Sequence, residues 1–235
     1  MLLKYMIKIS IEEGNITNQN VDLLVNSSNS YLLLGSGTAE QIRKAGGYYS
    51  PDDERFKEYW NLVNEASPAL RKVLDYIHGK RPRPSIIQRE CLEHIIRKNN
   101  SKELNLGDAI LTSSGNLAKL SNCADYVVHA IGMTYKWKVQ PSPPLVPATF
   151  KSVKNSLIKS FDIANEMNCE SIAMPVMCTR KGGLTKEESS KATLEAIKEL
   201  NKIETTVNRI AIVLYSENLA GERKWFEKFY NINEH

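Results

Sequence analysis

The stretch that decides the fold is Val21-Asp22-Leu23-Leu24-Val25-Asn26-Ser27-Ser28-Asn29, followed by the turn Gly35-Ser36-Gly37. Its apolar run, 21–25, predicts a buried strand of a mixed or parallel sheet, with two asparagines at the expected end. The glycine turn leads into a predicted helix over 38–45. Ligands of open α/β sheets bind at such strand ends, a helix N-terminus favours anions, and asparagine pairs with hydroxyls. The segment therefore predicts a ligand that carries phosphate and hydroxyl groups.

Two well-known nucleotide-binding motifs do not fit this segment. A dinucleotide fingerprint requires G-x-G-x-x-G directly after a strand, but Glu40 stands at the third glycine position. The chain also contains no G-x-x-x-x-G-K-[ST] run, which a P-loop requires. For this segment alone, a strand-to-helix loop with a purely structural role remains the alternative.

Three further pairs of segments resemble motifs of the macro domain, an ADP-ribose-binding (Appr-1″-p processing) family, and they occur in the family's order. They are Gly14-Asn15-Ile16-Thr17 with 21–26, then 107–115 with 126–132, and finally 171–175 with 178–184. The resemblance covers roughly residues 7–47 and 84–230. It implies a three-layer α/β/α sandwich with a mixed, mostly parallel sheet.

The resemblance also implies a site. Asn29 matches the family's catalytic asparagine and would hold hydroxyls of the ribose distal to adenine. Asn26 is expected to brace the loop. Tyr215 stands where the family stacks an aromatic on adenine, with packing on the core as the alternative. The full set of residues expected to bind ligand is Asn15, Ile16, Asn26, Gly35, Ser36, Gly37, Thr38, Thr179, Arg180, Lys181, Gly182, Gly183 and Tyr215. Backbone N–H groups of 35–38 and 179–183 would surround the diphosphate.

Five positions depart from the family pattern. Asn15 replaces an aspartate that accepts a hydrogen bond from the adenine amino group. Ala39 occupies the position, ten residues after Asn29, of an aspartate that helps to activate water in the hydrolytic branch. Met133 replaces a proline, and the pair 180–181 (Arg-Lys) replaces glycine and a small or apolar residue. The missing carboxylate weighs against a fast hydrolase.

We therefore expect a protein that binds ADP-ribose or a related ADP-ribosyl metabolite, free or on a protein, with slow ADP-ribosyl hydrolysis. One alternative is a non-catalytic ADP-ribose reader. Another is a single-stranded nucleic-acid module of the poly(A)-binding kind. Nucleic acid is the less favoured partner because the net charge is only +4 and the basic residues are spread along the chain. For the densest basic cluster, 80–83, a solvated linker between helices is the favoured interpretation over contact with nucleic acid.

Cysteine usage predicts reduced thiols and neither a metal nor a cofactor. The four cysteines are Cys91, Cys123, Cys169 and Cys178, and no pair of them has C-x-x-C spacing. Cys178 lies in the expected phosphate loop, where a small filler is the favoured interpretation and a nucleophile paired with His129 the alternative. No segment is apolar enough to span a membrane, and the N-terminus lacks a signal peptide, so we expect a cytoplasmic protein.

Strands and helices alternate along the chain, as in α/β folds. The predicted strands are 6–12, 22–26, 108–113, 126–131, 171–175 and 209–215. The predicted helices are 38–45, 85–98, 149–167, 186–202 and 220–230. Thr185 and Glu188 form a capping-box pattern, which sets the second glycine loop directly before another helix N-terminus.

Residues 48–83 match neither flanking segment and are expected to form a helical insertion within a single domain, 1–235. Two apolar stripes at helical spacing predict a hairpin: Phe56, Tyr59, Trp60 and Val63, then Leu70, Val73, Leu74 and Ile77. Ser67 is the expected N-cap of the second helix. Packing against the main domain is the favoured role, and a lid or a dimer contact is the alternative.

Overall fold

The computed structural model describes residues 7–78, 83–119, 123–135, 145–215 and 227. Its centre is one sheet, in the strand order β1-β7-β6-β2-β4-β3. The strands are β1 (Lys8–Glu13), β7 (Arg209–Leu214), β6 (Ser171–Pro175), β2 (Leu23–Asn29), β4 (Tyr126–Tyr135) and β3 (Ala109–Ser113). Neighbours from β1 to β4 are parallel, whereas β3 and the short β5 (Leu145–Val146) run antiparallel to β4. This confirms the mixed, mostly parallel sheet.

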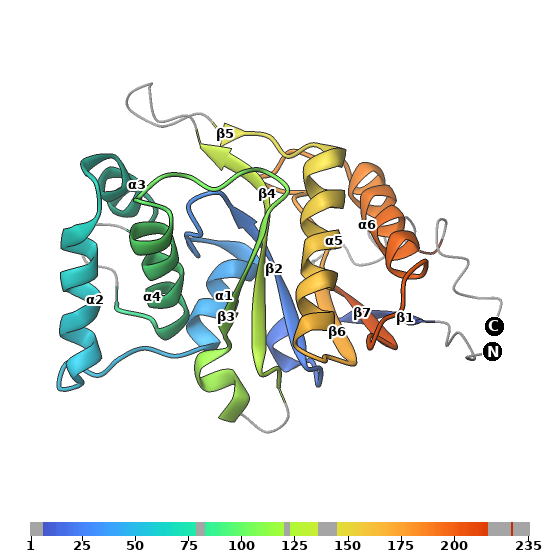
Figure 1. Cartoon of the computed structure of the whole chain (residues 1–235), viewed down its shortest axis with the longest axis horizontal. Helices are drawn as coiled ribbons and strands as arrows, with labels where there is room; N and C mark the ends of the chain where they lie inside the picture. The colour runs from blue at the N-terminus through green and yellow to red at the C-terminus, as the bar shows by residue number, and fades with distance from the viewer. Residues whose placement is uncertain (1–6, 79–82, 120–122, 136–144, 216–226, 228–235) are drawn as a thin grey trace.

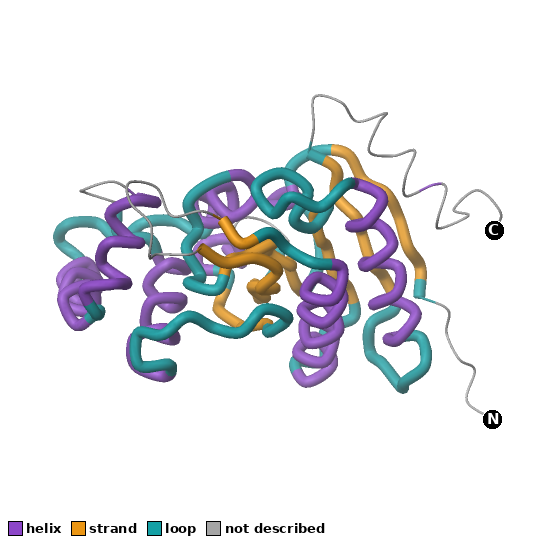
Figure 2. The backbone as a smooth tube through the Cα atoms, turned by 90° about the horizontal axis from the view of Figure 1, so that it is seen from above, coloured by secondary structure: helices purple, strands orange, loops and turns teal. Residues whose placement is uncertain are grey.

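Helices cover both faces of the sheet, which makes the three layers seen in Figures 1 and 2. The helices are α1 (Gly37–Ala45), α2 (Glu54–Glu65), α3 (Pro68–His78), α4 (Ile86–Glu93), α5 (Phe150–Glu166) and α6 (Lys186–Leu200). Strand alternation explains the two cores, because Leu24 faces the cluster under α1 to α4 while Leu23 and Val25 face that under α5 and α6. The predicted three-layer sandwich is therefore confirmed.

The helical hairpin in 48–83 is present and packs on the main core. Tyr59 and Leu62 of α2 are buried in the same cluster as Leu70 of α3 and Leu92 of α4. Leu62 lies outside the predicted stripe, whereas Trp60 and Val63 of that stripe are only partly buried. The hydroxyl of Ser67 accepts from Leu70 N at 3.3 Å, as an N-cap does.

Two strands extend beyond their predicted ends. The strand expected over 22–26 continues to Asn29, because its pairing with β4 runs on through Ser28↔Ile131 and, past an irregularity, to Asn29↔Met133. The strand expected to end at Ile131 continues to Tyr135, where β5 adds a third partner strand for β4. Asn29, which was expected to lie beyond the strand, is therefore its last residue, and the predicted end at Asn26 is wrong.

The remaining helix predictions need smaller changes. The helix predicted over 85–98 ends as an α-helix at Glu93 and continues as a π-helical turn, His94–Lys98. The helix predicted over 220–230, apart from residue 227, and most of the basic cluster 80–83 lie outside the described residues. In the described part of the chain, no helix combines the length and apolar character that a membrane span requires.

Asp22 ties the amino-terminal ends of β2 and β6 together. Its carboxylate accepts from Glu170 N and Ser171 N, both at 2.8 Å, and from the hydroxyl of Ser171 at 2.9 Å. Charge-assisted bonds of this kind are among the stronger ones in proteins. They fix the neighbouring strands at the edge opposite the glycine loops.

Candidate functional site

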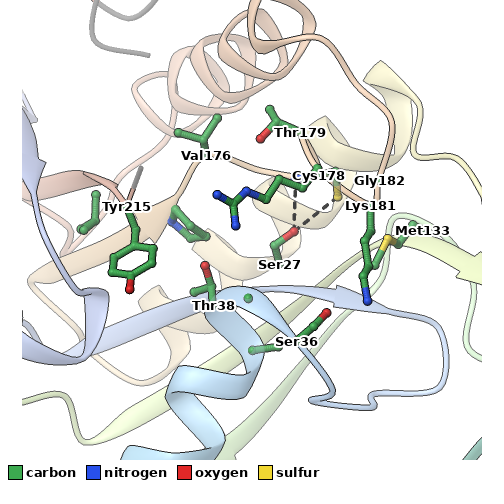
Figure 3. A pocket seen from close by; sticks show the side chains of 15 residues that line it. Ser27, Ser36, Thr38, Met133, Val176, Cys178, Thr179, Lys181, Gly182 and Tyr215 are labelled. Carbon is green, nitrogen blue, oxygen red and sulfur yellow. Dashed lines mark hydrogen bonds between the residues drawn. The ribbon is translucent and has the colours of Figure 1, made fainter. Parts of the chain in front are cut away.

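A cleft opens at the carboxyl ends of the central parallel strands, beside the two glycine loops (Figure 3). Its first cavity, of about 220 Å³, lies between the N-terminus of α1, the β6–α6 loop and the end of β7. The lining residues are Ser27, Ser36, Gly37, Thr38, Ala39, Met133, Pro175, Val176, Cys178, Thr179, Arg180, Lys181, Gly182, Val213 and Tyr215. The site thus lies where open α/β sheets bind ligands.

A second cavity, of about 310 Å³, adjoins the first. The two share five lining residues, which are Ser27, Ser36, Ala39, Met133 and Lys181. The second cavity adds Asn29, Leu33, Gly35 and Tyr135. We treat the two cavities as one cleft with two compartments, because they share these five residues.

The N-terminus of α1 points open donors into the first cavity. Its N-cap, Ser36, makes no side-chain capping bond, and Gly37 has a φ of 61°, in the left-handed region that favours glycine. The first N–H groups of a helix have no partner inside it, so they are available to an anion.

The N-terminus of α6 differs from that of α1, because a capping box closes it. Thr185 N donates to Glu188 Oε2 at 2.9 Å, and Glu188 N donates to Thr185 Oγ1 at 3.1 Å, which confirms the predicted capping box. The second glycine loop therefore contributes its own amides, while the open helix terminus of the cleft belongs to α1.

The β6–α6 loop is folded tightly around Cys178. This residue has a φ of 57°, its N–H donates to Ser27 Oγ at 3.2 Å, and its carbonyl accepts from Leu184 N at 3.1 Å. A Cβ on Gly182 would lie 2.6 Å from Cys178 Cα, so only glycine fits there. Within the described residues, the amides from Thr179 to Gly182 have no protein acceptor and remain free for a ligand.

The charge of the cleft is positive. Arg180 and Lys181 are its only charged lining residues among those described, and neither has a carboxylate partner in that part of the chain. Ala39, at the position where a carboxylate was expected from the family pattern, lines both cavities with a methyl group. The cleft thus suits an anion, and its described lining residues supply no carboxylate base.

Asn29 lines the second cavity, but its amide also holds the loop that follows β2. Nδ2 donates to Leu33 O at 2.9 Å, and Oδ1 accepts from Tyr31 N at 3.1 Å and Leu33 N at 3.4 Å. These bonds fix a turn in which Leu32 has a φ of 53°. One Nδ2 hydrogen remains for a ligand.

Asn26 is buried in β2 and lines neither cavity. Its Nδ2 lies 3.0 Å from His129 Nδ1, so it braces β4 rather than the loop, contrary to expectation. His129 Nε2 lies 3.0 Å from the hydroxyl of Thr112. Burial, and to a smaller extent the charge of His94, lowers the pKa of His129 to about 3, so the ring is neutral. This network is part of the core.

Other predicted site residues are divided between the cleft and its surroundings. Asn15 and Ile16 line neither cavity; Asn15 Oδ1 caps a short 3₁₀ turn, Ile16–Asn18, by accepting from Thr17 N at 3.0 Å. Tyr215 lines the first cavity and is 58% exposed, which excludes the alternative that it packs on the core. Gly183 lies beside the cleft without lining it.

Sequence reasoning missed several lining residues, above all Ser27, Val176 and Tyr135. Tyr135 follows the predicted end of its strand. A signal for Ser27 was present in the sequence. It follows Asn26 directly in the strand, so its side chain points to the opposite face of the sheet from that of Asn26.

The cleft offers little nucleophilic chemistry. Burial raises the pKa of the Cys178 thiol to about 11, although the Ser27 hydroxyl opposes this, so the thiol stays protonated at neutral pH. The histidine considered as its partner, His129, contacts Cys91 Sγ at 3.5 Å instead. Within the described residues, no group of three or more His, Cys, Asp or Glu is placed to hold a metal ion.

Comparison with known proteins identifies the relatives of this chain. The macro domain family model matches residues 61–193. A macro domain-containing protein of Caldanaerobacter subterraneus subsp. tengcongensis is 27% identical, over 89% of this chain and 90% of its own length. An O-acetyl-ADP-ribose deacetylase 1 of Pantoea vagans is 24% identical, over 89% of this chain and 92% of its own length. The structure of a mutant Oceanobacillus iheyensis macrodomain, solved with ADPR, matches with a TM-score of 0.62 at 20% identity, over 95% of this chain and 94% of its own length.

Proposed function

This chain belongs to the macro domain family, and from that premise we propose that it binds ADP-ribose, or a related ADP-ribosyl metabolite, in the cleft. The observation that carries the proposal is the convergence of two sets of free backbone amides, from α1 and from 179–182, beside Arg180 and Lys181. Two such sets suit the two phosphates of a diphosphate. Tyr215, exposed at the end of β7, supports stacking on the base.

We further propose that the ligand is free ADP-ribose or the ADP-ribosyl group of a modified protein, and that hydrolysis is slow. Asn29 supports an orienting role, because it lines the second cavity and keeps one amide hydrogen. Ala39 supplies no base, and the Cys178 thiol is protonated. Water would then be positioned mainly by the substrate. We place this activity in the cytoplasm, in a single domain over 1–235 with 48–83 as its insertion.

Calorimetric titration tests the binding proposal. We expect micromolar affinity for ADP-ribose, about −8 kcal/mol, and much weaker binding of AMP and ribose 5-phosphate. A monophosphate cannot engage both sets of amides, so equal affinity for AMP and ADP-ribose would overturn the diphosphate assignment. A single-stranded poly(A) ligand is the control, and tight poly(A) binding with a steep salt dependence would instead favour the nucleic-acid alternative.

Release of ADP-ribose from a mono-ADP-ribosylated protein tests the slow hydrolysis. The wild type should turn over slowly, and Ala39→Asp should be faster because it adds a carboxylate to the wall shared by both cavities. A wild type that binds ADP-ribose but shows no release, with or without this substitution, is a reader.

A further inference from the structure

Ser27 lies at the boundary between the two compartments of the cleft. It belongs to β2 and lines both cavities. Figure 3 shows its side chain between Cys178 of the β6–α6 loop and the first turn of α1, where Thr38 lies. A ligand that spans both compartments must therefore pass over this hydroxyl.

The hydrogen bonds of Ser27 leave its hydroxyl hydrogen available. A serine hydroxyl can accept two hydrogen bonds and donate one. Cys178 N–H takes one acceptor position at 3.2 Å, since a backbone N–H can only donate. The other contact is Cys178 Sγ, at 3.4 Å, where either atom can be the donor. Sulfur is a weak acceptor, and the thiol remains protonated, so a stronger acceptor on a ligand would win the Ser27 hydrogen.

The other residues at this boundary add donors and no acid. Of the five residues shared by both cavities, Ser27, Ser36 and Lys181 carry polar hydrogens, and Ala39 and Met133 carry none. Figure 3 shows Lys181 reaching from the β6–α6 loop toward the side of the cleft where Ser36 lies. The described residues that line the two cavities include these hydroxyl and ammonium donors and no carboxylate, a combination that suits an anionic oxygen.

We propose that Ser27 is a ligand-binding residue that donates its hydroxyl hydrogen to the second phosphate of the ligand, the one esterified to the distal sugar. This inference rests on the proposed function and deepens it. The amides of α1 and 179–182 hold the phosphates from two sides, while Ser27, from the strand below, and Lys181, from the loop, meet the second phosphate at the boundary. Ser27 thereby helps to select diphosphates over monophosphates.

The competing role for Ser27 is to position the loop through Cys178 N–H, without touching ligand. Titrations of Ser27→Ala with ADP-ribose, ADP and AMP separate the two roles. The matched control is Ser28→Ala, because Ser28 is buried, lines neither cavity and donates only to Asn29 O at 3.4 Å. Ser27→Thr keeps the hydroxyl.

If Ser27 donates to the second phosphate, Ser27→Ala should weaken ADP-ribose and ADP about tenfold or more, as loss of a bond to a charged acceptor does. AMP should weaken less than about twofold, Ser28→Ala should leave all three ligands unchanged, and Ser27→Thr should restore part of the loss. An equal loss for all three ligands would overturn the inference in favour of loop positioning, and no loss would overturn it outright. A wild type that binds no ADP-ribose would instead reject the proposed function, and this inference with it.

Discussion

Replacing Asn29 should destabilise the protein measurably, because its amide organises the loop between β2 and α1. Asn29→Ala removes three hydrogen bonds, to Leu33 O at 2.9 Å, Tyr31 N at 3.1 Å and Leu33 N at 3.4 Å. At about 1 kcal/mol net for each, with the longest worth less, the loss is about 2–3 kcal/mol. For a chain of this size each kcal/mol lowers Tm by about 2–4 °C, so we expect a drop of about 5–10 °C.

Urea and thermal unfolding of wild type, Asn29→Ala and Asn29→Asp measure this effect. Asn29→Asp keeps an acceptor for Tyr31 N and Leu33 N, but it places an oxygen against Leu33 O, so its loss should be intermediate. The loop walls the second cavity, so Asn29→Ala should also weaken ADP-ribose binding, and it should slow any release of ADP-ribose further still. If Asn29→Ala unfolds within about 0.5 kcal/mol of wild type while ADP-ribose release disappears, the amide serves the ligand and not the loop.

Three further outcomes follow from the structure. Gly182→Ala should unfold at a lower temperature than wild type and lose ADP-ribose binding, because its Cβ would meet the backbone of Cys178. Gly37→Ala has free space for its Cβ, so thermal unfolding should show a loss of only about 1–2 kcal/mol in the free energy of unfolding, from the left-handed backbone conformation. Asp22→Ala should lower the free energy of unfolding in urea by about 2–4 kcal/mol, more than most surface changes do, because three donors lose one carboxylate. The pKa of His129 is lowered to about 3, so between pH 6.5 and pH 5 its ring takes up a proton only when the protein unfolds. The free energy of unfolding should therefore be level above pH 6.5 and be lower by about 2 kcal/mol at pH 5. A His129→Gln variant whose free energy of unfolding falls just as much between pH 6.5 and pH 5 would refute this.

Local patterns in the sequence were enough to predict most elements and the general place of the site. The apolar strand at 21–25 and the capping box of Thr185 and Glu188 depend on near neighbours in the chain, and both are present. The glycine loops likewise follow strands and precede helices as predicted, and residues from both line the cleft. The helical hairpin was predictable because an apolar stripe at helical spacing has to be buried.

Only the tertiary structure decided which polar atoms face the ligand. Whether β2 stops at Asn26 or at Asn29 depends on pairing with β4, about a hundred residues away, and not on the asparagines themselves. That pairing places Asn26 on His129, turns Asn29 toward its own loop, and sets Ser27 under Cys178. Residue type fixes what a side chain can donate or accept, and packing between distant segments determines which of those bonds remain free.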